Sequence, residues 1–331
     1  MNEMTFFEEL AARCQLGRPL SPPSPVSGGY LHKMYRLDTS GGRYAVKLLN
    51  PSIMRRPDAQ GNFARAERLE RVLQKHDLPI VPALEIDGQK MQCIGEQYAY
   101  VFPWLDAKAL PYDEIRPDHC AVMGGILAKI HSLEQKCARF SQPPFQSDWQ
   151  QYAAQAETRC PELAAALHHH MSLLYTAQQE YNRAMHHMPP RLCISHADMD
   201  CKNVLWSEGR PHLIDLECLD YGCPPWDMFI LALSWAGGAV CALTVDRLIA
   251  FVSAYRAGGG EIDVCWEELY GSGYAWLNWL QYNTRRALGM EGGDSQEQAL
   301  GKSQALDTIL RIVHHRDMQE TVLEKLHSLS P

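Results

Sequence analysis

Residues 196–205 read HADMDCKNVL, and residues 213–217 read LIDLE. Apolar residues flank both polar groups, which is typical of short strands that end in functional loops. Asp198 and Asn203 lie five positions apart on the first loop, so one side chain can face a substrate while the other faces a metal ion. The second stretch would bring Asp215 back beside Asn203, and Mg²⁺ prefers such carboxylate and amide oxygens as ligands.

A lysine earlier in the chain completes this pattern. Residues 44–47 read YAVK, which places Lys47 on a predicted strand soon after the glycine-bearing turn at residues 27–29. Phosphoryl transfer requires a lysine and metal ions to hold dispersed negative charge, and a carboxylate to accept the proton of the incoming hydroxyl. Each element occurs often by chance, but the order and spacing of the three together indicate a phosphoryl-transfer site.

The first third of the chain predicts a small β-rich lobe. A hairpin is expected from strand-like residues at 34–37 and 44–48, because the turn between them carries glycines that can adopt positive φ. The other elements expected here are a helix at 1–13, a helix at 59–76, and strands at 83–86 and 98–102.

From about residue 117 the spacing of apolar residues becomes helical. The elements expected here are a helix at 120–133, two or three helices within 147–187, short strands at 192–195, 204–206 and 212–216, and helices from 225 to the end. The sequence therefore predicts an α+β fold with a small N-terminal antiparallel β lobe, residues 1–105, and a larger, mainly helical C-terminal lobe, residues 106–331.

Composition narrows the class of protein. The 331 residues are 46% hydrophobic and 21% charged, as in a folded globular chain, and the net charge of −8 argues against nucleic-acid binding. Residues 1–190 hold 20 acidic and 20 basic side chains, so the whole negative excess lies in residues 191–331. Such a field favours a cationic partner, although a solvated acidic surface would leave the same signature.

The cysteines and the apolar segments bear on where the protein works. Its eleven cysteines include no Cys-x-x-Cys pair, and the N-terminus is acidic rather than a basic signal segment, which favours a reduced, cytoplasmic protein. The largely apolar run at residues 228–243 is shorter than the roughly 20 residues that a bilayer requires, so we expect a buried helix and no membrane partner.

At the quoted residues the chain resembles the aminoglycoside phosphotransferase and choline kinase superfamily, which has a protein-kinase-like fold. The superfamily's catalytic loop has the form His-x-Asp-x-x-x-x-Asn, matched by His196, Asp198 and Asn203. Its metal-binding segment has the form Ile-Asp-aromatic-Glu, which the second stretch matches except that Leu216 replaces the aromatic residue. The resemblance covers about residues 26–235.

The resemblance implies a role for each matching residue. Asp198 would be the catalytic base, and Asn203 and Asp215 would hold Mg²⁺. Lys47 would contact the α- and β-phosphates of ATP or GTP. Its partner would be Glu67, which lies 15 residues before Pro82, the usual offset in this superfamily; Glu70, one helical turn further on, is the rival.

The remaining nucleotide contacts are implied in the same way. The strand at 98–102 would lead to a hinge that reads adenine, where the C=O of Pro103 accepts from the adenine amino group and the N–H of Leu105 donates to the ring. Ser27 and Gly28 would lie near the phosphates, although their turn is a poor match to a strict phosphate loop.

Three residues are candidates for acceptor binding. Asp200 stands where the superfamily often has histidine, and it would either contact a cationic acceptor or face solvent. Glu217 lies beside the catalytic residues and adds a second carboxylate. Trp279 belongs to an aromatic cluster at helical spacing, which either packs in a core or forms a wall of the acceptor pocket.

Taken together, the resemblance implies an ATP- and Mg²⁺-dependent phosphotransferase acting on a hydroxyl of a small, amine-bearing molecule, such as an aminoglycoside-like antibiotic or an amino alcohol. Two alternatives stay open: a metabolic sugar kinase, and a non-catalytic kinase-like protein of the spore-coat type. Intact Lys47, Asp198, Asn203 and Asp215 argue against the non-catalytic alternative. A protein kinase is disfavoured because no Asp-Phe-Gly or Ala-Pro-Glu segment occurs.

Overall fold

The computed structural model describes residues 3–26, 32–138, 140 and 143–329. Two of the predicted nucleotide contacts, Ser27 and Gly28, lie outside these residues. The chain divides into two compact units, which we describe separately. Unit one contains Met1–Leu110 and His196–Asp220, and unit two contains Pro111–Ser195 and Tyr221–Pro331.

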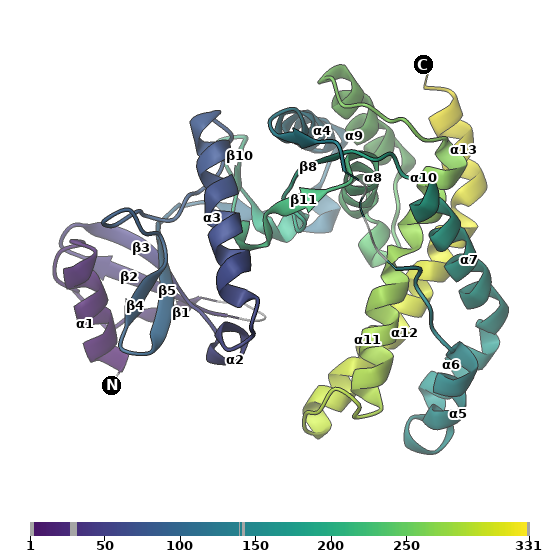
Figure 1. The fold of residues 1–331 in the computed structure, drawn as a ribbon, viewed down its shortest axis with the longest axis horizontal. Helices are drawn as coiled ribbons and strands as arrows, with labels where there is room; N and C mark the ends of the chain where they lie inside the picture. The colour runs from purple at the N-terminus through teal and green to yellow at the C-terminus, as the bar shows by residue number, and fades with distance from the viewer. Residues whose placement is uncertain (1–2, 27–31, 139, 141–142, 330–331) are drawn as a thin grey trace. The chain divides into compact units, whose positions relative to one another are not determined.

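Unit one is built on a five-stranded sheet with the order β1-β2-β3-β5-β4, in which neighbouring strands are antiparallel (Figure 1). The strands are β1 (Ser24–Val26), β2 (Lys33–Thr39), β3 (Gly42–Leu48), β4 (Gln92–Ile94) and β5 (Gln97–Pro103). The predicted hairpin is confirmed as β2–β3, which closes at the Thr39–Gly42 pair. Gly41 in its turn cannot be larger, because a Cβ there would lie 2.4 Å from the carbonyl oxygen of Leu16.

Two small apolar clusters of described residues lie in unit one. Helix α1 (Glu3–Arg13) buries Phe7 and Leu10 against Leu37 and Val46 of the sheet, and removing such apolar side chains from water is the main stabilising term. The second core is formed by Leu49, Phe63, Ala83 and Tyr100. It includes helix α3 (Ala59–Lys75), which follows the one-turn helix α2 (Pro51–Met54).

The predicted strand at residues 83–86 is wrong. In this segment the N–H of Leu84 donates to the carbonyl oxygen of Val101 at 2.8 Å, and Ile86 forms an isolated bridge with Gln89. Strand β4 pairs only with residues 97–99 of β5, so the segment meets β5 beyond that pairing, at a single residue. One such contact is too little to form a strand.

The segment 196–220 returns to unit one through a second sheet. This sheet has the order β10-β9-β6 and consists of β6 (Lys108–Ala109), β9 (Val204–Ser207) and β10 (Arg210–Leu213). Leu213 also exchanges backbone hydrogen bonds with the loop before residue 83: its N–H donates to Pro79 at 2.7 Å and its C=O accepts from Val81 at 2.8 Å. The sequence predicts one boundary after residue 105, whereas these contacts assign a later segment to the N-terminal unit.

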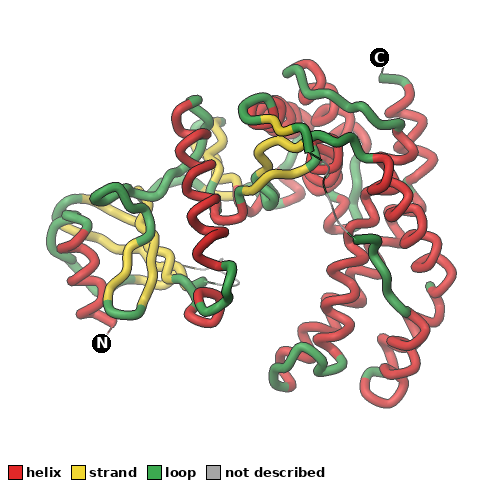
Figure 2. Tube along the Cα trace, viewed as in Figure 1, coloured by secondary structure: helices red, strands yellow, loops and turns green. Residues whose placement is uncertain are grey.

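Unit two is mainly helical, as the red tube in Figure 2 shows. Its helices are α4 (Pro117–His131), α5 (Trp149–Arg159), α6 (Pro161–His169), α7 (Met171–His187), α8 (Pro224–Trp235), α9 (Val245–Ala257), α10 (Trp266–Ser272), α11 (Trp276–Ala287), α12 (Ser295–Asp317) and α13 (Gln319–His327). A small sheet joins β7 (Gln135–Lys136), β8 (Leu192–Ser195) and β11 (Asp220–Gly222). Three helices therefore occupy residues 147–187, within the predicted number.

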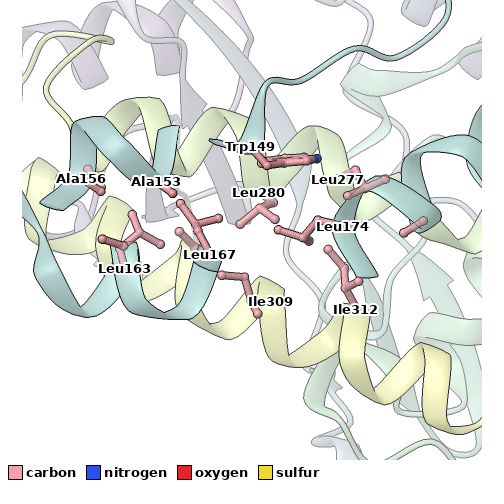
Figure 3. Packing of buried hydrophobic residues seen from close by; sticks show 14 of the residues in the cluster. Trp149, Ala153, Ala156, Leu163, Leu167, Leu174, Leu277, Leu280, Ile309 and Ile312 are labelled. Atoms are coloured by element: carbon pink, nitrogen blue, oxygen red, sulfur yellow. The ribbon is translucent and has the colours of Figure 1, made fainter. Parts of the chain in front are cut away.

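One core of unit two lies between helices from both halves of its sequence (Figure 3). Trp149 of α5 and Leu174 of α7 pack with Leu280 of α11 and Ile309 of α12, and all four are essentially inaccessible to solvent. The predicted fold class, α+β with a protein-kinase-like architecture of an antiparallel β region and a larger helical region, is confirmed. Among the described helices, none has the length and apolar character needed to cross a membrane.

Candidate active site

The predicted catalytic loop is anchored by its histidine. His196 is fully buried, and its Nε2 lies 3.1 Å from the carbonyl oxygen of Ile214, which can only accept. Burial lowers the pKa of His196, so the imidazole is neutral at physiological pH. The histidine thus joins the two sequence stretches by an Nε2–H donor and is not itself placed to move a proton.

Two residues of this site have backbone conformations that side chains disfavour. Ala197 and Asp215 both have φ near +61°. A left-handed residue other than glycine costs about 1–2 kcal/mol, and such strain persists where the surrounding structure enforces it. The turn at Asp215 also explains why β10 ends at Leu213 instead of continuing to the predicted residue 216.

Asp198 is held from one side of its carboxylate. Its Oδ2 accepts a hydrogen bond of 2.8 Å from the amide of Asn203 and lies 3.3 Å from Nζ of Lys202. Burial raises the pKa of Asp198, against the opposing effects of Lys202 and Asn203. Both contacts use Oδ2, so Oδ1 is the oxygen that remains for an incoming hydroxyl, and a raised pKa makes the carboxylate a better proton acceptor.

The segment that carries Asp215 returns beside Asn203. The 3₁₀ turn η2 (Cys201–Asn203) ends at Asn203, whose carbonyl oxygen accepts from the N–H of Ile214 at 3.0 Å. The Asn203 amide nitrogen donates to both the backbone and the side chain of Asp198, so its oxygen points away from those contacts. Amide and carboxylate oxygens are ligands that suit a divalent cation such as Mg²⁺.

Lys47 supplies direct evidence that cationic charge belongs here. Its ammonium group lies 2.5 Å from Oδ1 of Asp215 and 2.6 Å from Oε2 of Glu217. Burial by itself would lower the pKa of Lys47, but the two carboxylates outweigh it and raise the pKa. The carboxylates of Asp215 and Glu217 thus converge on a cation, and oxygen donors of this kind suit a divalent cation; Asn203 and Asp215 stay the predicted ligands.

Helix α3 does not provide the partner of Lys47. Oε1 of Glu67 accepts hydrogen bonds from the hydroxyl of Tyr100 at 2.9 Å and from the N–H of Met91 at 3.2 Å. The rival Glu70 binds Lys90 at 2.7 Å. The predicted Lys47–Glu67 pair is therefore absent from the described contacts, in which Tyr100 and Met91 bind the Glu67 carboxylate.

A cavity within unit one nevertheless gathers these residues. It is lined by Lys47, Ala66, Glu67, Glu70, Ala83, Tyr100, Phe102, Leu216 and Glu217. Helix α3 also packs against the 3₁₀ turn η3 (Leu216–Cys218), which closes one wall of the cavity. A lining that combines a lysine with aromatic and small side chains is expected of a nucleotide pocket.

The predicted hinge residues follow strand β5. Pro103 is exposed and pairs with Tyr44 of β3 at the end of the sheet. Leu105 lies in the loop beyond it, and in the described chain its N–H takes no part in a backbone hydrogen bond. A free main-chain donor after β5 agrees with the predicted contact to adenine, which stays a prediction.

The candidate acceptor residues have other contacts as well. The Asp200 carboxylate accepts from the N–H of Cys201 at 2.6 Å and so caps turn η2. Glu217 is occupied by Lys47. In unit two, Trp279 is 42% exposed and stacks on Tyr282, with ring centroids 5.5 Å apart, so it is not a core residue.

Two further residues of the site carry no motif that sequence reasoning could detect. His32 contacts Glu217 through Nε2 at 3.2 Å, and Lys90 neutralises Glu70. Both are buried, which is unusual for charged or titratable side chains, but burial of a single polar residue leaves no periodic signal in a sequence.

Comparisons with known proteins identify the family and the fold. Residues 23–265 match the phosphotransferase enzyme family. A spectinomycin phosphotransferase solved with ADP and spectinomycin is similar in structure, with a TM-score of 0.68 and 13% identity, covering 96% of this chain and 99% of that chain. No curated protein sequence matches.

Two other solved structures are similar over nearly their whole length. An amicoumacin kinase, solved with AMP-PNP and Ca²⁺, gives a TM-score of 0.60 and 14% identity, covering 93% of this chain and 94% of that chain. A microcompartment-associated aminopropanol kinase gives a TM-score of 0.55 and 14% identity, covering 96% of this chain and 99% of that chain. Identities this low establish the fold alone.

Proposed function

The chain belongs to the phosphotransferase enzyme family and is a small-molecule kinase; from this premise we propose that it transfers the terminal phosphoryl group of ATP to a hydroxyl of a small, amine-bearing molecule. The observation that carries the proposal is the convergence, within one unit, of Lys47, Asp198, Asn203 and Asp215. A charge-binding lysine, a base and two metal ligands are the parts that phosphoryl transfer requires.

Asp198 acts as the base in this proposal. Oδ1 accepts the proton of the acceptor hydroxyl, while Asn203 and Lys202 keep the carboxylate oriented through Oδ2. Lys47, whose side chain is 9% exposed, holds the phosphates and offsets their charge. When bound, Mg²⁺ neutralises charge on the phosphate oxygens, and Asn203 and Asp215 are the residues that hold it.

The nucleotide occupies the cavity of unit one in this proposal. Tyr100 and Phe102 contact the base, and the main chain at Pro103 and Leu105 reads its edge. Main-chain recognition at these two positions suits ATP, and competition between ATP and GTP for the wild-type protein tests the choice.

The amine-bearing acceptor is supported by charge and by relatives. The whole excess of eight negative charges lies in residues 191–331, and an acidic surface concentrates cations. The similar structures include enzymes named for spectinomycin and for aminopropanol. Asp200 of unit one is the residue that we propose for acceptor contact, and the exposed Trp279 of unit two stays a separate prediction.

A substrate screen tests this proposal directly. ADP release is measured by a coupled assay with aminoglycosides, other antibiotics, choline, ethanolamine, aminopropanol and neutral sugars. We expect turnover only with amine-bearing acceptors, and a KM for the acceptor that rises with salt, because ions screen charges beyond about 8 Å at physiological strength. A neutral sugar as the sole good substrate would identify a sugar kinase instead, and no nucleotide binding at all would favour the non-catalytic alternative.

We also propose that the protein works in the cytoplasm. All eleven cysteines are free thiols, several of them buried as small apolar side chains. Thiol titration of the protein purified without reductant, compared with the same protein after reduction, checks this: equal thiol counts are expected.

A further inference from the structure

A chain of buried polar contacts runs from the start of β2 to the metal-binding segment. Nε2 of His32 lies 3.2 Å from one oxygen of Glu217, and the other oxygen of Glu217 lies 2.6 Å from Nζ of Lys47. The side chains of His32 and Lys47 are 4% and 9% exposed, and that of Glu217 is 15% exposed. Little water reaches these groups, so each depends on the others for its hydrogen bonds.

The tautomer of His32 follows from its second contact. Nδ1 of His32 lies 2.9 Å from the backbone N–H of Asn50, which can only donate. Nδ1 is therefore the unprotonated acceptor, and the proton of a neutral imidazole must sit on Nε2. His32 thus donates from Nε2 to Glu217 and accepts at Nδ1 from Asn50.

No glutamate of helix α3 competes for the lysine in the described contacts. Glu67 is held by Tyr100 and Met91, and Glu70 is held by Lys90 and by the N–H of Ala83. Lys47 is therefore held by Asp215 and Glu217, and Glu217 is the more buried of the two carboxylates.

We propose that Glu217 positions Lys47 in place of a helix α3 glutamate, and that His32 is a positioning residue that holds Glu217 through the Nε2–H donor. This inference rests on the proposed function, since it assigns the support of the phosphate-binding lysine. The inference goes beyond the proposed function because it places the support of Lys47 in His32, which immediately precedes β2, and in the segment that carries Glu217, and not in helix α3.

The experiment measures the affinity of ADP by calorimetry, once in excess EDTA and once with Mg²⁺. Binding without metal reports on Lys47 and its support, whereas a role of Glu217 only as a metal ligand would appear solely with Mg²⁺. If the wild-type protein binds no ADP under either condition, the proposed function fails and the inference falls with it.

Two conservative variants of His32 distinguish its contact with Glu217 from its structural contact with Asn50. His32→Gln places an amide N–H near the former Nε2 and keeps the donation to Glu217, whereas His32→Asn places an amide oxygen near the former Nδ1 and keeps only the contact with Asn50. We expect His32→Asn to weaken metal-free ADP binding on the order of ten-fold, the effect of losing one hydrogen bond to a charged group, and His32→Gln to stay within about three-fold of wild type.

Matched variants complete the test. Glu217→Gln is expected to weaken metal-free ADP binding at least as much as His32→Asn, and more than Glu67→Gln. His76→Asn, at an exposed position at the end of helix α3, serves as the histidine control and should bind as wild type. Thermal unfolding of each variant identifies any that fails to fold.

Three outcomes would overturn the inference. The first is metal-free ADP binding by His32→Asn that equals that of wild type. The second is metal-free ADP binding that His32→Asn retains and His32→Gln loses, which would show that only the Asn50 contact matters. The third is a larger loss in Glu67→Gln than in Glu217→Gln, which would return the support of Lys47 to helix α3.

Discussion

Replacing Lys90 with methionine should expose the cost of a buried charge beside the candidate nucleotide cavity. Nζ of Lys90 lies 2.7 Å from Glu70, and the two side chains are only 1% and 6% exposed. Methionine retains most of the lysine stem but leaves the Glu70 carboxylate buried without its cation. Removing one partner of a buried pair is strongly destabilising, because the remaining charge is uncompensated.

The size of the effect follows from the ability of the Glu70 carboxylate to take up a proton. Burial already raises the pKa of Glu70 from its ordinary value of 4.5, against the pull of Lys90, so without the lysine the carboxyl is expected to take up a proton. Protonating a carboxylate from its ordinary pKa of 4.5 costs about 1.36 kcal/mol for each pH unit above that value. The cost is about 3.4 kcal/mol at pH 7 and about 1.4 kcal/mol at pH 5.5. The folded variant binds a proton that the unfolded chain does not, so its stability falls as pH rises above 4.5.

Urea unfolding at pH 7 and pH 5.5 measures this prediction. We expect Lys90→Met to lose about 3 kcal/mol at pH 7 and roughly half as much at pH 5.5, with Lys75→Met, at an exposed position, within about 0.5 kcal/mol of wild type. The double variant Lys90→Met/Glu70→Leu should recover most of the loss, because apolar replacement of a whole buried pair is often neutral. A loss at pH 7 below about 0.5 kcal/mol, or a loss independent of pH, would refute the reasoning.

Three further predictions concern catalysis and packing. Asp198→Asn should lower kcat by about 10² to 10⁴ with ADP affinity unchanged by calorimetry, since only the proton acceptor is lost; a variant with more than half the wild-type kcat would contradict the assignment. Asp215→Ala should raise the Mg²⁺ concentration needed for half-maximal ADP release, or abolish release, and an unchanged Mg²⁺ profile would remove it from the metal site. Gly124→Ala should destabilise unit two by about 1–3 kcal/mol in thermal unfolding, because its Cβ would lie 2.2 Å from the carbonyl oxygen of Phe251. Gly125→Ala, whose Cβ meets open space, should stabilise unit two. Equal effects of the two substitutions would show that the α4–α9 contact is not tight.

The sequence alone determined most elements of the fold and the loop that carries Asp198 and Asn203. Local patterns are sufficient for the β2–β3 hairpin and helix α3, since turn glycines and apolar spacing act within a few residues. The side chains of Asp198 and Asn203 share one short loop, and the second stretch returns beside it, so their meeting follows from a spacing that the sequence displays.

Only the tertiary structure decided which carboxylate meets which cation. Glu67 and Glu70 are two glutamates one turn apart on helix α3, and the sequence does not say which of them meets a lysine. Their partners in the structure are Tyr100 and Lys90, which lie outside the helix. Lys47 meets Glu217 because the later segment folds back onto the N-terminal sheet. Which groups form a buried ion pair depends on their distance in the folded chain and on how little water reaches them, and the local sequence determines neither.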